Sequence, residues 1–169
     1  MGVYSQYKHR EKIPDGAELL ISILLRYPEV GSVHYCQDRH ALRFTFVVTN
    51  VQESSGQDLL LPALEVYHNL EGTEMQICEV DCKHEENVCI LTITRDVVSM
   101  TQNEVGLIVD ILKLHYAQRL VCDEGDLPEE ELLVQEEMID EMLATIKQDD
   151  IDKSVVAVRE EGRVLVFKT

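Results

Sequence analysis

Four segments of the chain carry apolar side chains at the three- and four-residue spacing that places them on one face of a helix. They cover residues 15–28, 55–69, 101–116 and 126–147. Three of them begin with a capping-box pair, at Asp15/Glu18, Thr101/Glu104 and Asp126/Glu129. In the second segment we expect Pro62 to lie in the first turn, because a later proline removes a backbone hydrogen bond.

Between these segments, apolar and polar residues alternate with a period of two, which is typical of strands with one buried face. The alternating runs lie around residues 33–35, 42–48, 75–83, 88–94, 154–158 and 163–167. Turn residues separate them in pairs and therefore indicate three hairpins. We predict an α+β fold in the order αββ-αββ-αα-ββ, with four helices and an antiparallel sheet of about six strands.

A comparison of the chain with itself suggests an internal αββ duplication. A shift of 41 residues places Leu19-Leu20 on Leu60-Leu61 and Gly31 on Gly72, with a hairpin after each. Similar folding needs alone would produce the same pattern. The chain length of 169 residues fits one domain. We expect residues 13–169 to form a single α+β domain after a flexible tail, residues 1–12.

The last hairpin is apolar on both faces. A three-residue loop at Glu160-Glu161-Gly162 would place four valines on one face: Val156, Val158, Val164 and Val166. The other face would hold Val155, Ala157, Leu165 and Phe167. Because burial of each Val or Leu is worth about 1.5–3 kcal/mol, both faces should be covered. Either the hairpin lies centrally between helices, or the four valines meet a second copy in a homodimer.

Negative charge is concentrated in one stretch of the sequence. The formal charge is −17, yet residues 123–152 hold 13 acidic residues and one base, so this acidic helical segment contributes −12 and the remaining chain −5. Its predicted helix has an apolar stripe, and the remaining arc holds Glu129, Glu130, Glu136, Glu137, Asp140 and Glu141. This arc either confers solubility or docks a basic protein surface. It would repel a phosphate backbone, so we expect no direct nucleic-acid binding.

The five cysteines are an odd number, which does not suit a secreted disulfide framework. The run Cys78-x3-Cys82-x-His84-x4-Cys89 resembles a zinc-ligand cluster in composition, but Cys78 and Cys82 would lie about 13 Å apart in a strand. We therefore expect no metal and no cofactor. A loop centred between Glu85 and Glu86 would set Cys82 opposite Cys89. We favour two reduced thiols there, with a redox-sensitive pair as the alternative.

Motifs for catalysis and for phosphate binding are missing. The chain has no Gly-x-Ser-x-Gly elbow, no glycine-rich phosphate loop and no basic-aromatic strand, so no catalytic residue is proposed. No stretch approaches the roughly 20 apolar residues that cross a bilayer, and the N-terminus lacks the apolar region of a secretory signal. We expect a cytoplasmic protein without membrane contact.

These observations favour a non-enzymatic interaction or regulatory module that docks a basic partner through its acidic helix, with self-association through the last hairpin left open. A first alternative is a small-molecule-binding domain or enzyme with a pocket between sheet and helices. A second alternative is a thiol regulator that uses Cys82 and Cys89.

Overall fold

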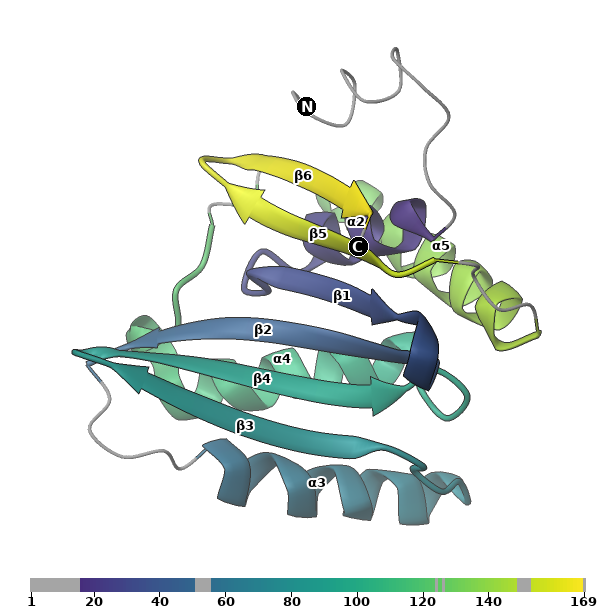
Figure 1. Cartoon of the computed structure of the whole chain (residues 1–169), viewed down its shortest axis with the longest axis horizontal. Coiled ribbons are helices and arrows are strands. Elements are labelled where there is room, and N and C mark those ends of the chain that lie inside the picture. The colour runs from purple at the N-terminus through teal and green to yellow at the C-terminus, as the bar shows by residue number, and fades with distance from the viewer. Residues whose placement is uncertain (1–15, 51–55, 124, 126, 149–152, 169) are drawn as a thin grey trace.

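The computed structural model describes residues 16–50, 56–123, 125, 127–148 and 153–168. They form a six-stranded antiparallel sheet in the order β3-β4-β2-β1-β5-β6 (Figure 1). The strands are β1 (Ser32–Cys36), β2 (Ala41–Thr49), β3 (Cys78–Glu85), β4 (Val88–Asp96), β5 (Val155–Glu160) and β6 (Arg163–Lys168). Consecutive strands pair as three hairpins, which confirms the predicted fold class and element order. The predicted tail, residues 1–12, lies outside the described residues.

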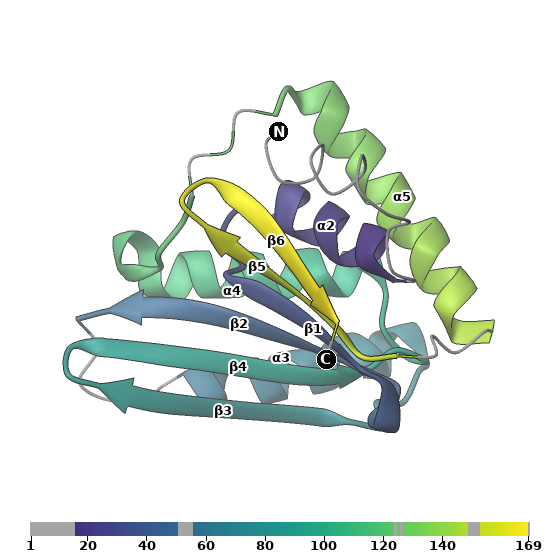
Figure 2. The same cartoon turned by 45° about the horizontal axis from the view of Figure 1, so that its top comes forward.

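Four helices lie on one face of this sheet: α2 (Ala17–Arg26), α3 (Gly56–Glu71), α4 (Gln102–Tyr116) and α5 (Glu129–Gln148) (Figures 1 and 2). Helix α4 crosses behind the central strands, α3 lies along β3, and α2 lies against β1 and β5. Helix α5 packs on the outside of α2. Within the described residues, none of the helices is both long and apolar enough to cross a bilayer.

Strand alternation separates a helix-facing core from an opposite face. Along β2, Leu42, Phe44, Phe46 and Val48 are buried, whereas Arg43, Thr45 and Val47 between them are only half-buried. No described helix covers the side on which those three residues lie, which we call the open face. The fold therefore has one packed layer of helices and one exposed sheet surface.

The two N-terminal αββ units are arranged symmetrically. Strands β2 and β4 pair antiparallel at the centre, β1 and β3 flank them, and α2 and α3 lie over the outer strands. Two copies related by a local two-fold axis would give this arrangement. The internal duplication nevertheless stays a prediction, because topology alone recurs in unrelated proteins.

The helix predictions have different outcomes. Gly16, with φ of 85°, is the N-cap of α2, and the predicted capping residue Asp15 lies outside the described residues. Pro62 lies well inside α3 instead of in its first turn. It is tolerated because it is exposed on the side opposite the buried Leu60 and Leu64, where water can satisfy the freed carbonyl. Thr101 caps α4 as predicted and accepts a hydrogen bond from the Glu104 N–H at 3.2 Å.

The terminal hairpin differs from the prediction in its register, and its position in the sheet excludes one of the two alternatives. It lies at one edge of the sheet instead of centrally, and helices cover one of its faces. Its loop has two residues, because Glu161 and Gly162 both adopt the left-handed conformation and Glu160 pairs with Arg163. Val164 therefore lies on the helix-facing side, opposite Arg159, and is buried.

The register change divides the four valines proposed for self-association. Val164 and Val166 point to the helices, together with Val155 and Ala157. Val156 and Val158 share the open face with two other residues, Leu165 and Phe167. Phe167 is 51% exposed. A homodimer contact stays a prediction, and its surface becomes Val156, Val158, Leu165 and Phe167.

Candidate functional site

Helix α5 carries the predicted acidic arc and is anchored by a narrow apolar seam. Ile139, Leu143 and Ile146 recur at three- and four-residue spacing and are buried against the rest of the helical layer. This spacing fixes which side of α5 meets α2 and turns the remaining arc to solvent. The acidic residues at 149, 150 and 152 lie outside the described residues.

Five of the six acidic residues proposed for docking are exposed: Glu129, Glu130, Glu137, Asp140 and Glu141. We call these five the acidic surface. None of their carboxylates pairs with a Lys or Arg in the described part of the chain. Glu136 differs, because it is half-buried and accepts a hydrogen bond from Arg26 Nε at 2.6 Å. Arg26 therefore neutralises Glu136, and the other five carboxylates have no basic partner among the described residues.

Exposed apolar side chains accompany the acidic surface on α5. Leu133 is 57% exposed, Val134 46% and Met138 37%. Val134 and Met138 are four residues apart and therefore lie on one side of the helix. Exposed apolar side chains beside charged ones are common at protein interfaces, whereas a surface that only confers solubility needs no apolar side chains.

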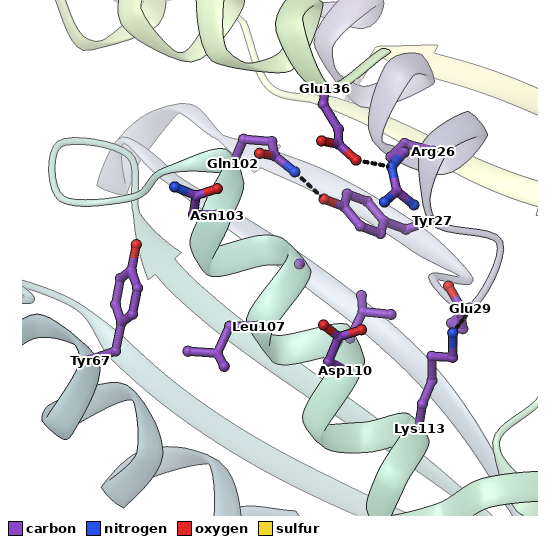
Figure 3. A pocket seen from close by; sticks show the side chains of 12 residues that line it. Arg26, Tyr27, Glu29, Tyr67, Gln102, Asn103, Leu107, Asp110, Lys113 and Glu136 are labelled. Carbon is purple, nitrogen blue, oxygen red and sulfur yellow. Dashed lines mark hydrogen bonds and ion pairs between the residues drawn. The ribbon is translucent and has the colours of Figure 1, made fainter. Parts of the chain in front are cut away.

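A polar groove of about 440 Å³ lies between the helices, beside the acidic helix (Figure 3). The Arg26–Glu136 ion pair borders it, and Gln102 Nε2 donates a hydrogen bond to the Tyr27 hydroxyl (Figure 3). Burial raises the pKa of Tyr27 above its ordinary value, although the Gln102 hydrogen bond opposes the rise. The hydroxyl therefore stays protonated at neutral pH.

The tight side of this groove depends on a glycine. A Cβ at Gly106 of α4 would lie 3.3 Å from the Tyr27 hydroxyl, so a larger residue would push Tyr27 away. At the other end, Lys113 Nζ lies 3.6 Å from a carboxylate oxygen of Glu29. Three pairs of lining residues, Arg26–Glu136, Tyr27–Gln102 and Glu29–Lys113, therefore connect α2 and the segment after it with α4 and α5.

A buried charged network ties α3 and α4 to the end of β4. Glu104 accepts hydrogen bonds from Arg95 Nε at 2.6 Å and Arg95 Nη2 at 2.8 Å, and it also contacts His68 Nε2. Arg95 and Glu104 are fully buried and His68 nearly so. Arg95 further donates to the Ile77 carbonyl at 2.8 Å and pairs with Asp96. Because every charge has a partner and solvent is excluded, this network is structural.

Asp96 also holds the chain before β3. Its carboxylate accepts hydrogen bonds from the backbone N–H groups of Gln76 and Ile77, and from the N–H and hydroxyl of Ser99. Burial alone would raise the pKa of Asp96, but these hydrogen bonds and the charge of Arg95 outweigh it and lower the pKa below its ordinary value. Asp96 is therefore ionised in the folded protein at neutral pH.

Cys82 and Cys89 come together, but not as directly opposite residues. The turn lies at Glu86 and Asn87, one position later than predicted, so Cys82 faces Leu91 and Cys89 faces His84. The two cysteines are diagonal neighbours on the helix-facing side, with Cα atoms 6.3 Å apart and sulfurs joined in a disulfide. This disulfide differs from the two reduced thiols that the sequence favours. That the pair acts as a redox switch stays a prediction.

A hollow of about 470 Å³ on the open face gathers basic side chains in this acidic protein. His34, Arg39, Arg43 and Lys153 line it. Arg39 is engaged by Glu79, which accepts from its Nη1 at 2.9 Å. Burial and the nearby Arg43 charge lower the pKa of His34, so its ring is neutral at pH 7. Sequence reasoning missed this hollow because its residues come from three separate segments.

The arrangement as a whole presents an unpaired acidic surface, a disulfide-linked hairpin and two polar hollows. Comparisons with known protein families and with curated proteins find no match for this chain.

Proposed function

We propose that this protein is a non-enzymatic interaction module whose acidic surface on α5 docks a basic surface of another protein. The observation that carries the proposal is the set of five exposed carboxylates without a described Lys or Arg partner, on a helix whose opposite side is buried. Unpaired surface charge of one sign speeds encounter with a partner of the opposite sign and selects against acidic ones.

The exposed apolar side chains of α5 specify the partner further. Leu133, Val134 and Met138 would gain little from a partner that is uniformly basic. A basic amphipathic helix offers both kinds of contact, because its apolar side can cover Val134 and Met138 while its Lys and Arg side chains meet the adjacent carboxylates. We therefore take a basic amphipathic helix as the expected form of the partner.

The test uses a labelled synthetic helical peptide with Leu on one side and Lys on the other. Its binding to the full chain is followed by fluorescence anisotropy at increasing NaCl concentration. We expect the affinity to fall steeply with salt, because the contact depends on exposed charges. The same peptide with every Lys replaced by Gln should bind weakly at all salt concentrations.

A matched pair of variants separates the acidic surface from overall charge. Glu137→Lys, Asp140→Lys and Glu141→Lys together should weaken peptide binding by about tenfold or more. The control reverses three exposed acids elsewhere, Glu65, Glu71 and Glu74, and changes the net charge equally. It should bind nearly as well as the wild type. Equal losses in both triple variants, or binding insensitive to salt, would show that α5 is not a docking surface.

A further inference from the structure

The disulfide-linked hairpin contains a third side chain that could coordinate metal. Cys82 and His84 of β3 and Cys89 of β4 each offer one ligand atom, and these atoms lie within 4.8 Å of one another. Cys82 Sγ is 3.9 Å from His84 Nε2. The cluster therefore holds two sulfurs and one imidazole nitrogen on the same side of two paired strands.

Strand geometry explains why these three residues meet. Cys82 and His84 are two residues apart on β3, so both point to the same side of the sheet. His84 pairs directly with Cys89 across the hairpin. Cys78 lies on that side too, but four residues along a strand separate it from Cys82 by about 13 Å. Cys78 is therefore too far from Cys82 to share a metal ion with it, whereas Cys82, His84 and Cys89 remain available as ligands.

The spacing and donor types suit zinc. Tetrahedral Zn–S bonds of about 2.3 Å and Zn–N bonds of about 2.0–2.1 Å place the ligand atoms roughly 3.5–3.8 Å apart. The 3.9 Å between Cys82 Sγ and His84 Nε2 is within a few tenths of an ångström of that separation. Two thiolates with one imidazole favour zinc over the oxygen-seeking Mg²⁺ and Ca²⁺.

Access and local charge also fit a cation. His84 is exposed and Cys82 half-buried, while Cys89 is fully buried and anchors the cluster to the core. The exposed Glu85 and Glu86 follow in the hairpin and add negative potential. A metal ion and a small thiol reagent can therefore both reach the Sγ atom of the half-buried Cys82.

We propose that Cys82, His84 and Cys89 bind one Zn²⁺ when the two cysteines are reduced, with water in the fourth position. On binding, the two thiols lose two protons to become thiolates. A low-molecular-weight disulfide can then accept two electrons from them and become two thiolates, while the Cys82–Cys89 bond forms and Zn²⁺ leaves. The hairpin thus alternates between a metal-bound reduced form and a metal-free oxidised form, independently of docking through α5.

The experiment titrates the reduced full chain with Co²⁺ under anaerobic conditions, and Zn²⁺ then displaces the Co²⁺. We expect one Co²⁺ per chain, with a thiolate-to-cobalt charge-transfer band and tetrahedral ligand-field bands. Prior oxidation of the chain with oxidised glutathione should abolish the bands. Cys82→Ser should also abolish them, whereas the control Cys78→Ser, on the same side of β3, should leave them unchanged.

His84→Ala provides the decisive variant. Because His84 is exposed, its removal should leave the circular dichroism spectrum and the urea midpoint unchanged. Loss of a residue that only positions a metal ligand lowers metal affinity by roughly 10–100-fold. Because His84 is itself a proposed ligand, His84→Ala should lower the affinity by more than that. The proposal is overturned if the reduced chain shows no stoichiometric site, if His84→Ala binds as tightly as the wild type, or if the oxidised chain still binds metal.

Discussion

Removal of Glu104 should test how much the buried charged network contributes to folding. In the wild type, Arg95 Nε and Nη2 donate hydrogen bonds to the two carboxylate oxygens of Glu104 at 2.6 and 2.8 Å. Glu104→Ala deletes both of these acceptors and also removes the contact with His68. Arg95 is fully buried, so water cannot replace the lost acceptors. The variant therefore leaves a cation inside the protein with only part of its hydrogen bonding.

The expected cost follows from the number of bonds lost and those that remain. Removing one partner of a buried ion pair usually costs about 3–5 kcal/mol. Because Arg95 keeps Asp96, the Ile77 carbonyl and Ser99 as acceptors, we expect a loss of unfolding free energy near the lower end of that range. A loss of about 3 kcal/mol is a large share of a total stability that is typically about 5–15 kcal/mol.

The exposed ion pair between Arg39 and Glu79 supplies a matched comparison. Arg39 binds Glu79 through both of its terminal nitrogens, yet the two side chains are 39% and 51% exposed. Solvent screens such a pair and reoccupies the freed positions, so Glu79→Ala should hardly change stability. The two variants remove the same chemistry from different surroundings, and their difference measures the effect of burial.

Urea unfolding, followed by circular dichroism, provides the assay. With an m-value of about 2 kcal/mol per molar, Glu104→Ala should lower the midpoint by roughly 1.5 M. The m-value should stay constant if the native state remains intact. A midpoint equal to that of Glu79→Ala would refute the reasoning, because it would mean that the network is solvated or that Arg95 finds another partner.

Two further predictions concern Asp96 and the sheet edge. Asp96 has a folded pKa below its ordinary 3.8, so its contribution to stability is present above pH 3.8 and is lost as the pH falls through the folded pKa. The difference in urea midpoint between Asp96→Asn and the wild type should thus be largest near neutral pH and shrink below pH 3.8; a constant difference would contradict this. At the sheet edge, the apolar open-face residues of β5 and β6 predict a homodimer. Sedimentation velocity should show that Leu165→Glu converts this dimer to a monomer. A wild-type protein that is monomeric at all concentrations would exclude the homodimer.

The fold class and the order of elements could be predicted because periodicity reports which side of each element is buried. Leu42, Phe44 and Phe46 alternate in the sequence and lie buried on one side of β2. In the same way, the three- and four-residue spacing of apolar residues predicts the buried side of α5, where Ile139 and Leu143 lie. Sheet order was not predictable in this way, because periodicity does not say which strands of different hairpins pair. The sequence therefore left two positions open for the last hairpin, and the structure places it at the sheet edge beside β1.

Both register errors arose at turns where residues other than glycine adopt positive φ. Glu86 has φ of 55° and Glu161 has φ of 49°. Such conformations are uncommon for glutamate, so sequence reasoning favoured other loop positions. At the β5–β6 turn, a one-residue shortening moved Val164 and Val166 to the opposite face from Val156 and Val158. At the β3–β4 turn, the shift kept Cys82 and Cys89 on one side and changed only their pairing.

The buried network was missed although its positions follow the apolar pattern. Arg95 continues the inward series of Leu91 and Ile93 on β4, and His68 follows Leu64 by one helical turn on α3. A charged residue on an inward position requires a buried partner of opposite charge, and both Asp96, the next residue, and the capping-box residue Glu104 take that part. The consequence is a difference between helices: α3 and α4 are tied to β4 by buried charges, whereas α5 is held by its apolar seam and the half-exposed Arg26–Glu136 pair. The basic partner proposed for α5 would therefore compete with Arg26 for Glu136 only, and it could engage the five carboxylates of the acidic surface without breaking any ion pair of the described chain.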